Sequence, residues 1–464
     1  MRTKNRHQNS PLIFCLTTAF MLSIGTTILF GQSVEIKWND VHQTITGFGA
    51  SGGNSSAQNF MKLSESDRTS LCDLFFSADK GIGLTMVRNE LYWHIEPSPG
   101  VWDWKKDSAQ VWLMNEAQKR GVNYFWSAAW SMPVWMKDNN DIKHGGHLLT
   151  AHYQDYADYL SKYVREYKSR FNIEIRAVSI QNEPDQSTNY QSCIWNGTQF
   201  LNFIKNNLGP TFRKDRIKAK IVFPEPSDFR KISQFADSAM NDPDARKYVS
   251  IIAAHQYDQS FLTKPDTIFP KDSLESAYGL GKKYGKELWQ SENSFIGGKP
   301  EYGIVKGIGA ALMIYNTMVK AEVNAYVWWA FLNSWGDNEG LADLTGNTYK
   351  ISKRLYAFGN FSKFVRPGYV MIGITNTPKP GVYCLAFKNP KTKKFAIIMI
   401  NKNAEPSCVE VIFSGFIADS VTPWVTSELY DLEKQTDVKV NDLKNGFPAN
   451  LPALSITTFV GRAN

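Results

Sequence analysis

The chain has 464 residues, which is enough for two domains or for one large domain with an appendage. Hydrophobic residues make up 43% and charged residues 21%, values that are typical of globular proteins and exclude a disordered chain. The formal charge of +8 falls to +5 without the three basic residues among the first 32. No cluster of Lys and Arg indicates a nucleic-acid partner.

The N-terminal 32 residues have the layout of a secretory signal peptide. Arg2, Lys4 and Arg6 precede an apolar stretch at residues 11–30, and Gly31 is the one small residue near the expected cleavage site. An uncleaved membrane anchor is the alternative. No other apolar run approaches the length of a membrane span. We therefore expect a secreted, soluble monomer, extracellular or periplasmic, without a membrane partner once the signal is removed.

The cysteines give no indication of a metal site. Cys15 lies in the signal segment, and no CxxC pair or His cluster accompanies the remaining four, which are Cys72, Cys193, Cys384 and Cys408. A zinc site is therefore not expected. Export permits disulfides, but four scattered cysteines in a large chain are more often buried and free, so no bridge is assigned.

From residue 46 the chain repeats a short apolar run, a loop and an amphipathic helix. Eight runs are typical of buried strands, at residues 47–50, 82–87, 122–128, 175–180, 219–223, 249–254, 287–290 and 323–328. Helices are predicted at residues 64–76, 107–120, 150–170, 198–208, 228–240, 273–284, 302–321 and 349–364. This alternation predicts a (β/α)8 TIM barrel at residues 46–364.

A doubly wound open sheet is the alternative fold, because residues 47–53 form a glycine-rich segment after the first strand. That fold would place an acidic residue at the end of its second strand. Here the second strand leads into Arg88 and Asn89 instead, which favours the barrel.

After residue 364 the pattern changes to short strands separated by Pro, Gly and Asn turns. Strands are predicted at residues 382–388, 395–401, 408–413, 428–431 and 456–461. They predict a small antiparallel β-sandwich at residues 365–464. Residues 34–38 alternate like a half-buried strand outside the barrel, so the segment 33–45 is assigned to the sandwich.

Functional residues of a TIM barrel lie at the carboxyl ends of its strands. In this chain those positions hold a cation, an amide, a His, a Tyr, several Trp and two carboxylates. The residues are Arg88, Trp130, Asn182, Glu183, His255, Tyr257, Glu292, Trp328 and Trp329. Two facing carboxylates about 5–5.5 Å apart are the equipment of retaining glycoside hydrolysis, in which one protonates the leaving oxygen and the other attacks the anomeric carbon.

The neighbours of the two glutamates suggest different roles for them. Asn182, next to Glu183, is placed to contact a sugar 2-hydroxyl, so Glu183 is expected to be the proton donor. Arg88 and Tyr257 are expected to hold Glu292 ionised as the nucleophile.

Each site residue also has a structural explanation when it is taken alone. Asn182 and Glu183 could cap a helix, Glu292 and Arg88 could form a salt bridge, and His255 could be a satisfied hydrogen-bonding residue. Aromatic residues, 13% of the chain with 14 Trp, fit a rich core as well as sugar-stacking surfaces. Because adjacent strand residues face opposite sides, only one of Trp328 and Trp329 is expected to contact sugar.

Several segments resemble glycoside hydrolase family 30, within the clan of retaining (β/α)8 glycosidases. They are GFGASGG at residues 47–53, SIQNEPD at 179–185, HQY at 255–257, WQSEN at 289–293 and RPGY at 366–369. The resemblance runs from about residue 34 to the C-terminus. It implies that Glu183 is the acid/base and Glu292 the nucleophile, that a β-sandwich is fused to the barrel, and that no metal or cofactor takes part.

Residues 130–137, 189–200 and 324–329 resemble the xylan-cleaving branch of that family. In that branch, basic and hydroxyl residues of the loop after strand 8 commonly recognise a glucuronyl substituent. Here the loop, residues 330–340, has no Arg, Lys or Tyr and carries Asp337 and Glu339, which would repel a uronate. A glucuronyl requirement is therefore not expected.

These observations favour a secreted, retaining endo-β-glycanase on plant cell-wall polysaccharide, above all an endo-β-1,4-xylanase acting on xylan, arabinoxylan or glucuronoxylan. Alternatives are a β-1,6-glucanase, a β-1,6-galactanase and an exo-acting, glucosylceramidase-like β-glycosidase. A non-catalytic glycan-binding protein is a further alternative, although a binder has no need for two facing carboxylates.

Overall fold

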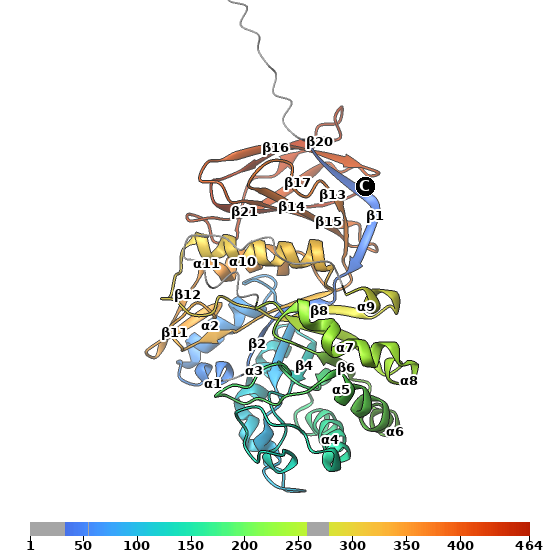
Figure 1. Ribbon diagram of the computed structural model, residues 1–464. Coiled ribbons are helices and arrows are strands. Elements are labelled where there is room, and N and C mark those ends of the chain that lie inside the picture. The colour runs from blue at the N-terminus through green and yellow to red at the C-terminus, as the bar shows by residue number, and fades with distance from the viewer. Residues whose placement is uncertain (1–32, 54, 258–277) are drawn as a thin grey trace, which may run out of the picture. The chain divides into compact units, whose positions relative to one another are not determined.

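The computed structural model describes residues 33–53, 55–257 and 278–464 (Figure 1). The expected signal peptide lies outside the described residues. Among the helices of the described ranges, none combines the length and the apolar character needed to cross a bilayer.

Eight parallel strands close into a barrel in chain order, which confirms the predicted (β/α)8 fold. They are β2 (Gly47–Ser51), β3 (Met86–Glu90), β4 (Tyr124–Ala128), β5 (Ile175–Ser179), β6 (Lys220–Pro224), β7 (Val249–His255), β8 (Glu287–Glu292) and β9 (Ala325–Trp328). The largest difference from prediction is at β3, which was expected at residues 82–87 and forms four residues later. The apolar residues 82–85 lead into this strand instead.

Helices surround the strands, and their ends follow local sequence signals. The Ser64 hydroxyl accepts the Asp67 N–H at 3.1 Å and starts α2, as its capping pattern predicts. The α-helices are α1 (Ser56–Phe60), α2 (Glu65–Phe76), α3 (Ser108–Lys119), α4 (Tyr153–Phe171), α5 (Gly197–Phe203), α6 (Gly209–Lys214), α7 (Ile232–Asn241), α8 (Pro243–Arg246), α9 (Gly279–Lys283), α10 (Ile304–Asn316) and α11 (Lys353–Ser362). The helix predicted at residues 273–284 lies partly outside the described residues.

Short helical segments of other types complete the barrel. The 3-10 segments are η1 (Trp93–Ile95), η2 (Trp104–Asp107), η3 (Val134–Met136), η4 (Thr150–His152) and η6 (Phe229–Lys231). The π-helical segments η5 (Ile204–Leu208) and η8 (Thr317–Ala321) continue α5 and α10. A three-stranded sheet after the barrel comprises β10 (Leu332–Asn333), β11 (Ala342–Thr345) and β12 (Thr348–Ile351).

The barrel interior is filled by side chains of unequal size. Trp126 and Trp289 meet edge to face, with ring centroids 5.4 Å apart. On β2, Gly47 and Gly49 leave room for β3 to approach. A Cβ on Gly49 would lie 2.6 Å from the carbonyl oxygen of Met86, so glycine is required there. The barrel is therefore a packed core, and any site must lie at its rim.

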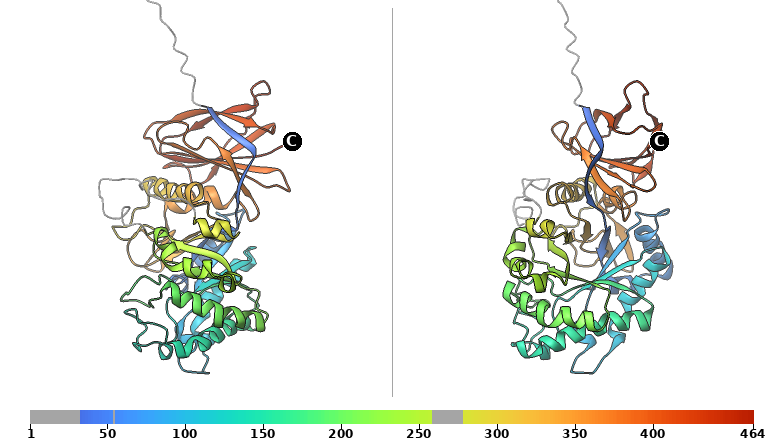
Figure 2. Two further views of the ribbon diagram at one scale, coloured as in Figure 1. Left: turned by 45° about the vertical axis from the view of Figure 1, so that its right-hand side comes forward. Right: turned by 90° about the vertical axis from the view of Figure 1, so that its right-hand side faces the viewer.

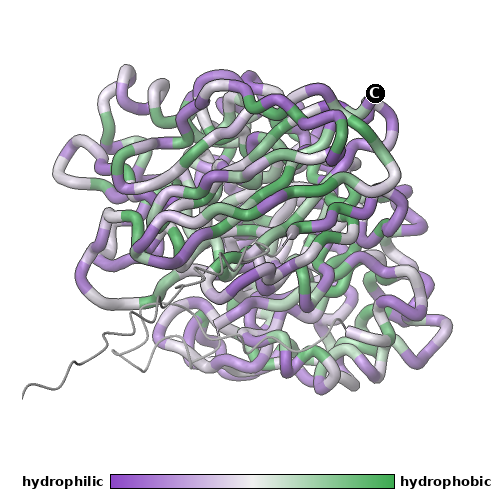
Figure 3. Tube along the Cα trace, turned by 90° about the horizontal axis from the view of Figure 1, so that it is seen from above, coloured by the Kyte–Doolittle hydropathy of each residue, from purple (hydrophilic) through white to green (hydrophobic). Residues whose placement is uncertain are grey.

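The second domain is a ten-stranded sheet that folds over so that its apolar faces meet. Its strands are β1 (Ser33–Thr44), β13 (Val370–Ile374), β14 (Val382–Lys388), β15 (Lys394–Asn401), β16 (Ser407–Ser414), β17 (Ser420–Thr426), β18 (Glu433–Lys434), β19 (Val438–Lys439), β20 (Gly446–Leu451) and β21 (Ser455–Arg462). Phe447 of β20 and Phe459 of β21 pack between the two faces, 5.2 Å apart. Seen from above, hydrophobic stretches run along the crossing strands, while outer loops are largely hydrophilic (Figure 3).

The N-terminal strand belongs to this second domain, as predicted. β1 pairs antiparallel with β13 and parallel with β16, so the sheet is mixed and not purely antiparallel as expected. In both turned views the blue strand runs beside the red strands (Figure 2).

The strand predicted at residues 428–431 is wrong. The Ser427 hydroxyl accepts the N–H groups of Leu429 and Tyr430, which makes a turn, and Leu429 is 85% exposed. The strand of this region is β17, a few residues earlier. β13 and β20 were not predicted at all.

Helices α10 and α11 contact both the barrel and the sheet (Figure 1). Asn360 of α11 donates to the Thr458 hydroxyl at 3.0 Å, and that hydroxyl donates to the Asn360 carbonyl at 2.8 Å. Ile398 and Ile456 of the sheet join the same apolar cluster as the barrel helices. The sheet therefore supports one side of the barrel through a continuous core.

The close approach of β2 to β3 makes a testable prediction. Gly49→Ala should lower the free energy of unfolding by about 1–3 kcal/mol, because the new methyl group overpacks against the Met86 backbone. Gly279→Ala is the matched control, since its Cβ would meet nothing within 4 Å, and it should stay within about 0.5 kcal/mol of the parent. Urea unfolding followed by tryptophan fluorescence measures both. Equal stability of the two variants would contradict the packing described.

Candidate active site

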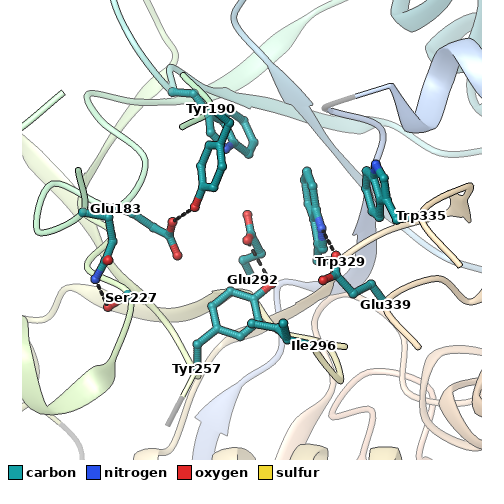
Figure 4. Close-up of a pocket in the computed structure, with 11 residues that line it drawn as sticks. Glu183, Tyr190, Ser227, Tyr257, Glu292, Ile296, Trp329, Trp335 and Glu339 are labelled. Atoms are coloured by element: carbon teal, nitrogen blue, oxygen red, sulfur yellow. Dashed lines mark hydrogen bonds between the residues drawn. The ribbon is translucent and has the colours of Figure 1, made fainter. Parts of the chain in front are cut away.

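A pocket of about 480 Å³ lies at the carboxyl ends of the barrel strands (Figure 4). It combines carboxylates, hydroxyl groups and indole rings. Its lining residues are Trp130, Glu183, Gln186, Tyr190, Ser227, Tyr257, Glu292, Ile296, Trp329, Trp335 and Glu339.

The two predicted glutamates face one another across this pocket (Figure 4). Glu183 follows β5, and Glu292 is the last residue of β8. One carboxylate oxygen of each, together with a ring nitrogen of His255, lie within 4.8 Å of one another. Strands far apart in the sequence thus bring two carboxylates to the separation at which a sugar carbon can be attacked and its leaving oxygen protonated in one site.

Glu292 is held through both carboxylate oxygens. The Arg88 guanidinium donates to Oε2 at 2.5 Å, and the Tyr257 hydroxyl donates to Oε1 at 3.0 Å. Burial raises the pKa of Glu292 above its ordinary value, while the charges of His255 and Arg88 act against that rise. The ionised form of Glu292 therefore depends on these two cations.

Glu183 has a different set of partners. The Tyr190 hydroxyl donates to its Oε2 at 2.9 Å, and His255 Nδ1 lies 3.1 Å from its Oε1. Its backbone is left-handed, with φ 45°, a conformation that non-glycine residues adopt mainly where surrounding contacts impose it. The Glu183 N–H donates to the carbonyl of Glu225 at 3.0 Å, which fixes that backbone.

His255 is fully buried among three carboxylates. Burial alone would lower its pKa, but Glu292, Glu183 and Glu225 together raise the pKa of His255 to about 10. The imidazole therefore carries a positive charge at neutral pH. It stabilises carboxylates at the base of the pocket and does not line the pocket itself.

Arg88 connects several groups of the site from a fully buried position. Besides Glu292 it donates to Asn182 Oδ1 at 2.6 Å, and it lies over the indole rings of Trp130 and Trp126 at 4.5 and 5.2 Å. With its oxygen engaged by Arg88, Asn182 keeps its amide nitrogen as the group that can donate to a sugar hydroxyl.

The two adjacent tryptophans at the end of β9 face opposite sides, as alternation requires. Trp329 lines the pocket, where its Nε1 donates to Glu339 at 2.9 Å and its ring stacks on Trp335 at 5.8 Å. Trp328 is fully buried, and its ring packs against Phe358. The prediction of Trp328 as a substrate-binding residue is therefore corrected, because its side chain points to the surrounding helices.

Several residues of the site were missed in the sequence, among them Tyr190, Trp335 and Glu225. Tyr190 and Trp335 lie in loops, where periodicity gives no signal. Glu225 lies one residue after β6 and is a strand-end carboxylate, so the rule that found Glu183 and Glu292 would also have found it. The predicted strand ends at residue 223, two positions before Glu225, and the structure extends it by one residue to Pro224.

The loop at residues 330–340 is acidic as expected, but its charge is smaller than its composition suggests. Burial and the neighbouring Asp337 raise the pKa of Glu339 to about 8. Glu339 is therefore mostly protonated at pH 7. The Asp337 carboxylate accepts from the Glu339 backbone N–H at 3.1 Å and from Asn333 at 2.8 Å, which holds the loop in place.

Comparison with known proteins places this site in a family. Residues 103–277 match the family model described as the glycosyl hydrolase family 30 TIM-barrel domain. The glucuronoxylanase XynC of Bacillus subtilis is 30% identical over 466 aligned positions, which cover 97% of each chain.

Two crystal structures resemble the whole described chain. The family 30 subfamily 8 xylanase Xyn30A of Clostridium acetobutylicum superposes with a TM-score of 0.79 at 28% identity, covering 93% of this chain and 100% of its own. The family 30 endoxylanase of Clostridium papyrosolvens C71 does so with a TM-score of 0.74 at 27% identity, covering 93% and 100%. The chain thus belongs to glycoside hydrolase family 30 and is a glycoside hydrolase.

Proposed function

We propose that the protein is a secreted, retaining endo-β-1,4-xylanase. The observation that carries this proposal is the pair Glu183 and Glu292, with carboxylate oxygens within 4.8 Å across a pocket lined by indole rings. Inverting enzymes need about 6.5–9.5 Å between their carboxyl groups to admit a water molecule. The shorter separation supports double displacement through a covalent glycosyl-enzyme.

In the first step, a Glu292 oxygen attacks the anomeric carbon while Glu183 gives its proton to the departing glycosidic oxygen. The C–O bond to the leaving chain breaks, and an ester bond between sugar and Glu292 forms. In the second step, Glu183 accepts a proton from water, which attacks the same carbon and releases Glu292. Asn182 assists both steps by donating to the sugar 2-hydroxyl, a contact that strengthens in the transition state.

Xylan is supported as the substrate by the relatives named above, which are described as a glucuronoxylanase, a xylanase and an endoxylanase. The loop at residues 330–340 lacks the cations that would bind a uronate. We therefore propose xylan or arabinoxylan as the preferred substrate, cleaved without need of a glucuronyl branch.

Product analysis tests the substrate directly. The enzyme is incubated with arabinoxylan, glucuronoxylan, β-1,6-glucan and β-1,6-galactan, and the products are separated by chromatography. A ladder of xylo-oligosaccharides from both xylans is expected. Release of single sugars only, or products from the β-1,6-linked polymers alone, would overturn the proposal.

The two glutamates should respond differently to substitution. Glu183→Gln should lower kcat on xylan by about 10²–10⁴-fold, because the leaving oxygen loses its proton donor. On an aryl xylobioside, whose leaving group needs no protonation, this variant should still release the aryl group in the first step. Glu292→Gln should be inactive on both substrates, because the attacking carboxylate is gone. Both variants should unfold at the parent temperature, and parent-like activity of either would refute its assigned role.

Substitutions of the two adjacent tryptophans should affect different properties, namely substrate binding for Trp329 and stability for Trp328. Trp329→Ala should raise KM about tenfold, equivalent to about 1.4 kcal/mol, with little change in the unfolding temperature. Trp328→Ala should lower the free energy of unfolding by about 3–5 kcal/mol, because it empties a core position. KM on arabinoxylan and thermal unfolding of both variants measure this. A reversed pattern would show that Trp328, and not Trp329, contacts the sugar.

The raised pKa of Glu339 predicts a pH-dependent preference. Below about pH 8 its carboxyl is neutral, and above that pH it gains a charge that repels a uronate. The ratio of activity on glucuronoxylan to activity on arabinoxylan should therefore fall as pH rises through about 8. About fivefold is expected, equivalent to about 1 kcal/mol of repulsion. In Glu339→Gln this activity ratio should not change with pH. A ratio that does not change with pH in the parent enzyme would contradict the prediction.

A further inference from the structure

A third carboxylate lies behind the two glutamates of the pocket. Glu225 follows β6, its side chain is fully buried, and it does not line the pocket. We infer that Glu225 is a positioning residue that acts through Arg88 and His255, the two cations that contact Glu292 and Glu183. The inference rests on the proposed double displacement and adds a residue that cannot touch the sugar.

Glu225 contacts both cations of the site. Its Oε1 lies 3.3 Å from Nη2 of Arg88 and 3.7 Å from Nε2 of His255. Each cation reaches a pocket glutamate with another nitrogen: Arg88 Nη1 donates to Glu292, and His255 Nδ1 lies 3.1 Å from Glu183. One buried oxygen therefore orients the two groups that in turn hold the nucleophile and the proton donor.

The backbone of Glu225 is also held in place by hydrogen bonds. Its φ is 58°, in the left-handed region, like that of Glu183. The Glu225 N–H donates to the Ala253 carbonyl at 3.0 Å, and its own carbonyl accepts the Glu183 N–H at 3.0 Å. Two glutamates in an unfavourable conformation are thus bonded to each other, which points to a site held in place by its surroundings.

A count of charges explains why a third carboxylate is needed. Before the reaction, with Glu183 protonated, Arg88 and His255 carry two positive charges, and Glu292 and Glu225 carry two negative charges. These five residues are at most 7% exposed, so a net charge among them would be poorly solvated. Without Glu225 the site would hold a surplus positive charge, because Glu292 would be the one carboxylate left to balance two buried cations.

The directions of the pKa shifts of Glu225 and Arg88 agree with this count of charges. Burial raises the pKa of Glu225, but Arg88 and His255 outweigh that effect and leave the pKa below its ordinary value. Burial lowers the pKa of Arg88, and Glu225 and Glu292 reverse that effect. These two cations therefore favour the ionised form of Glu225.

Other titratable groups also face this cluster. Tyr190 donates to Glu183, and Tyr257 donates to Glu292. Glu339 acts on Glu292 from the loop after β9 and is itself influenced by Asp337. Asp185 is paired with Lys231. None of these groups is itself altered by Glu225→Gln, and the control variant shows whether a shift in the pH profile is specific to Glu225.

The test is Glu225→Gln, which removes the charge and keeps the shape. The alkaline limb of its pH profile for kcat/KM on xylan should move down by about one pH unit or more, because the surplus positive charge favours loss of a proton from the site. Activity on an aryl xylobioside, which does not need the acid, should fall less than activity on xylan. Glu287→Gln is the matched control, since Glu287 lies at the other end of β8 and pairs with Lys220. Its alkaline limb should match that of the parent.

A folded Glu225→Gln variant with an unmoved limb, or with equal losses on the two substrates, would overturn the inference. If that variant does not fold, nitrogen chemical shifts of His255 in the parent enzyme provide the test. Both ring nitrogens should carry protons at pH 8, and a neutral ring at that pH would also overturn it. A parent enzyme without activity on either substrate would instead refute the proposed function, so the two failures are distinguishable.

Discussion

The site depends on one buried cation. The Arg88 guanidinium is removed from water on all sides, and such a charge is costly unless every face has a partner. Its Nη1 and Nη2 nitrogens contact oxygens of Glu292, Asn182 and Glu225, and two indole rings cover its plane. Because these partners come from different strands, the ends of β3, β5, β6 and β8 must meet at one position. The pocket therefore forms where the strand ends of the closed barrel surround this charge.

The general form of the fold could be predicted because each strand carries a periodic apolar signal of its own. The strand-end rule then found Glu183, Glu292 and Arg88 without any knowledge of their distances. Prediction from the sequence was less accurate where contacts between particular side chains and the backbone determine the local structure. The turn after Ser427 depends on one hydroxyl that caps two backbone N–H groups, and the predicted strand there was wrong.

In the site, too, some features could be predicted from the sequence and others could not. Alternation predicted that Trp328 and Trp329 would face opposite ways, but only the structure shows which one reaches the pocket. Glu225 left no signal beyond its position, because its role depends on two cations that come from β3 and β7. The charge of the loop at residues 330–340 was overestimated because burial changes the protonation of Glu339. Residue type is visible in a sequence, whereas protonation state depends on neighbours.

The pairing of β1 in the second domain has a consequence for how the chain reaches its native state. Glu35 bonds to Thr375, 340 positions later in the chain. Such a contact closes a very long loop. The conformational entropy of that loop must be lost before the pairing contributes any stabilisation. During synthesis the first described strand has no partner until nearly the whole chain has emerged. The sheet that supports α10 and α11 therefore cannot be completed before the C-terminal part of the chain has been synthesised.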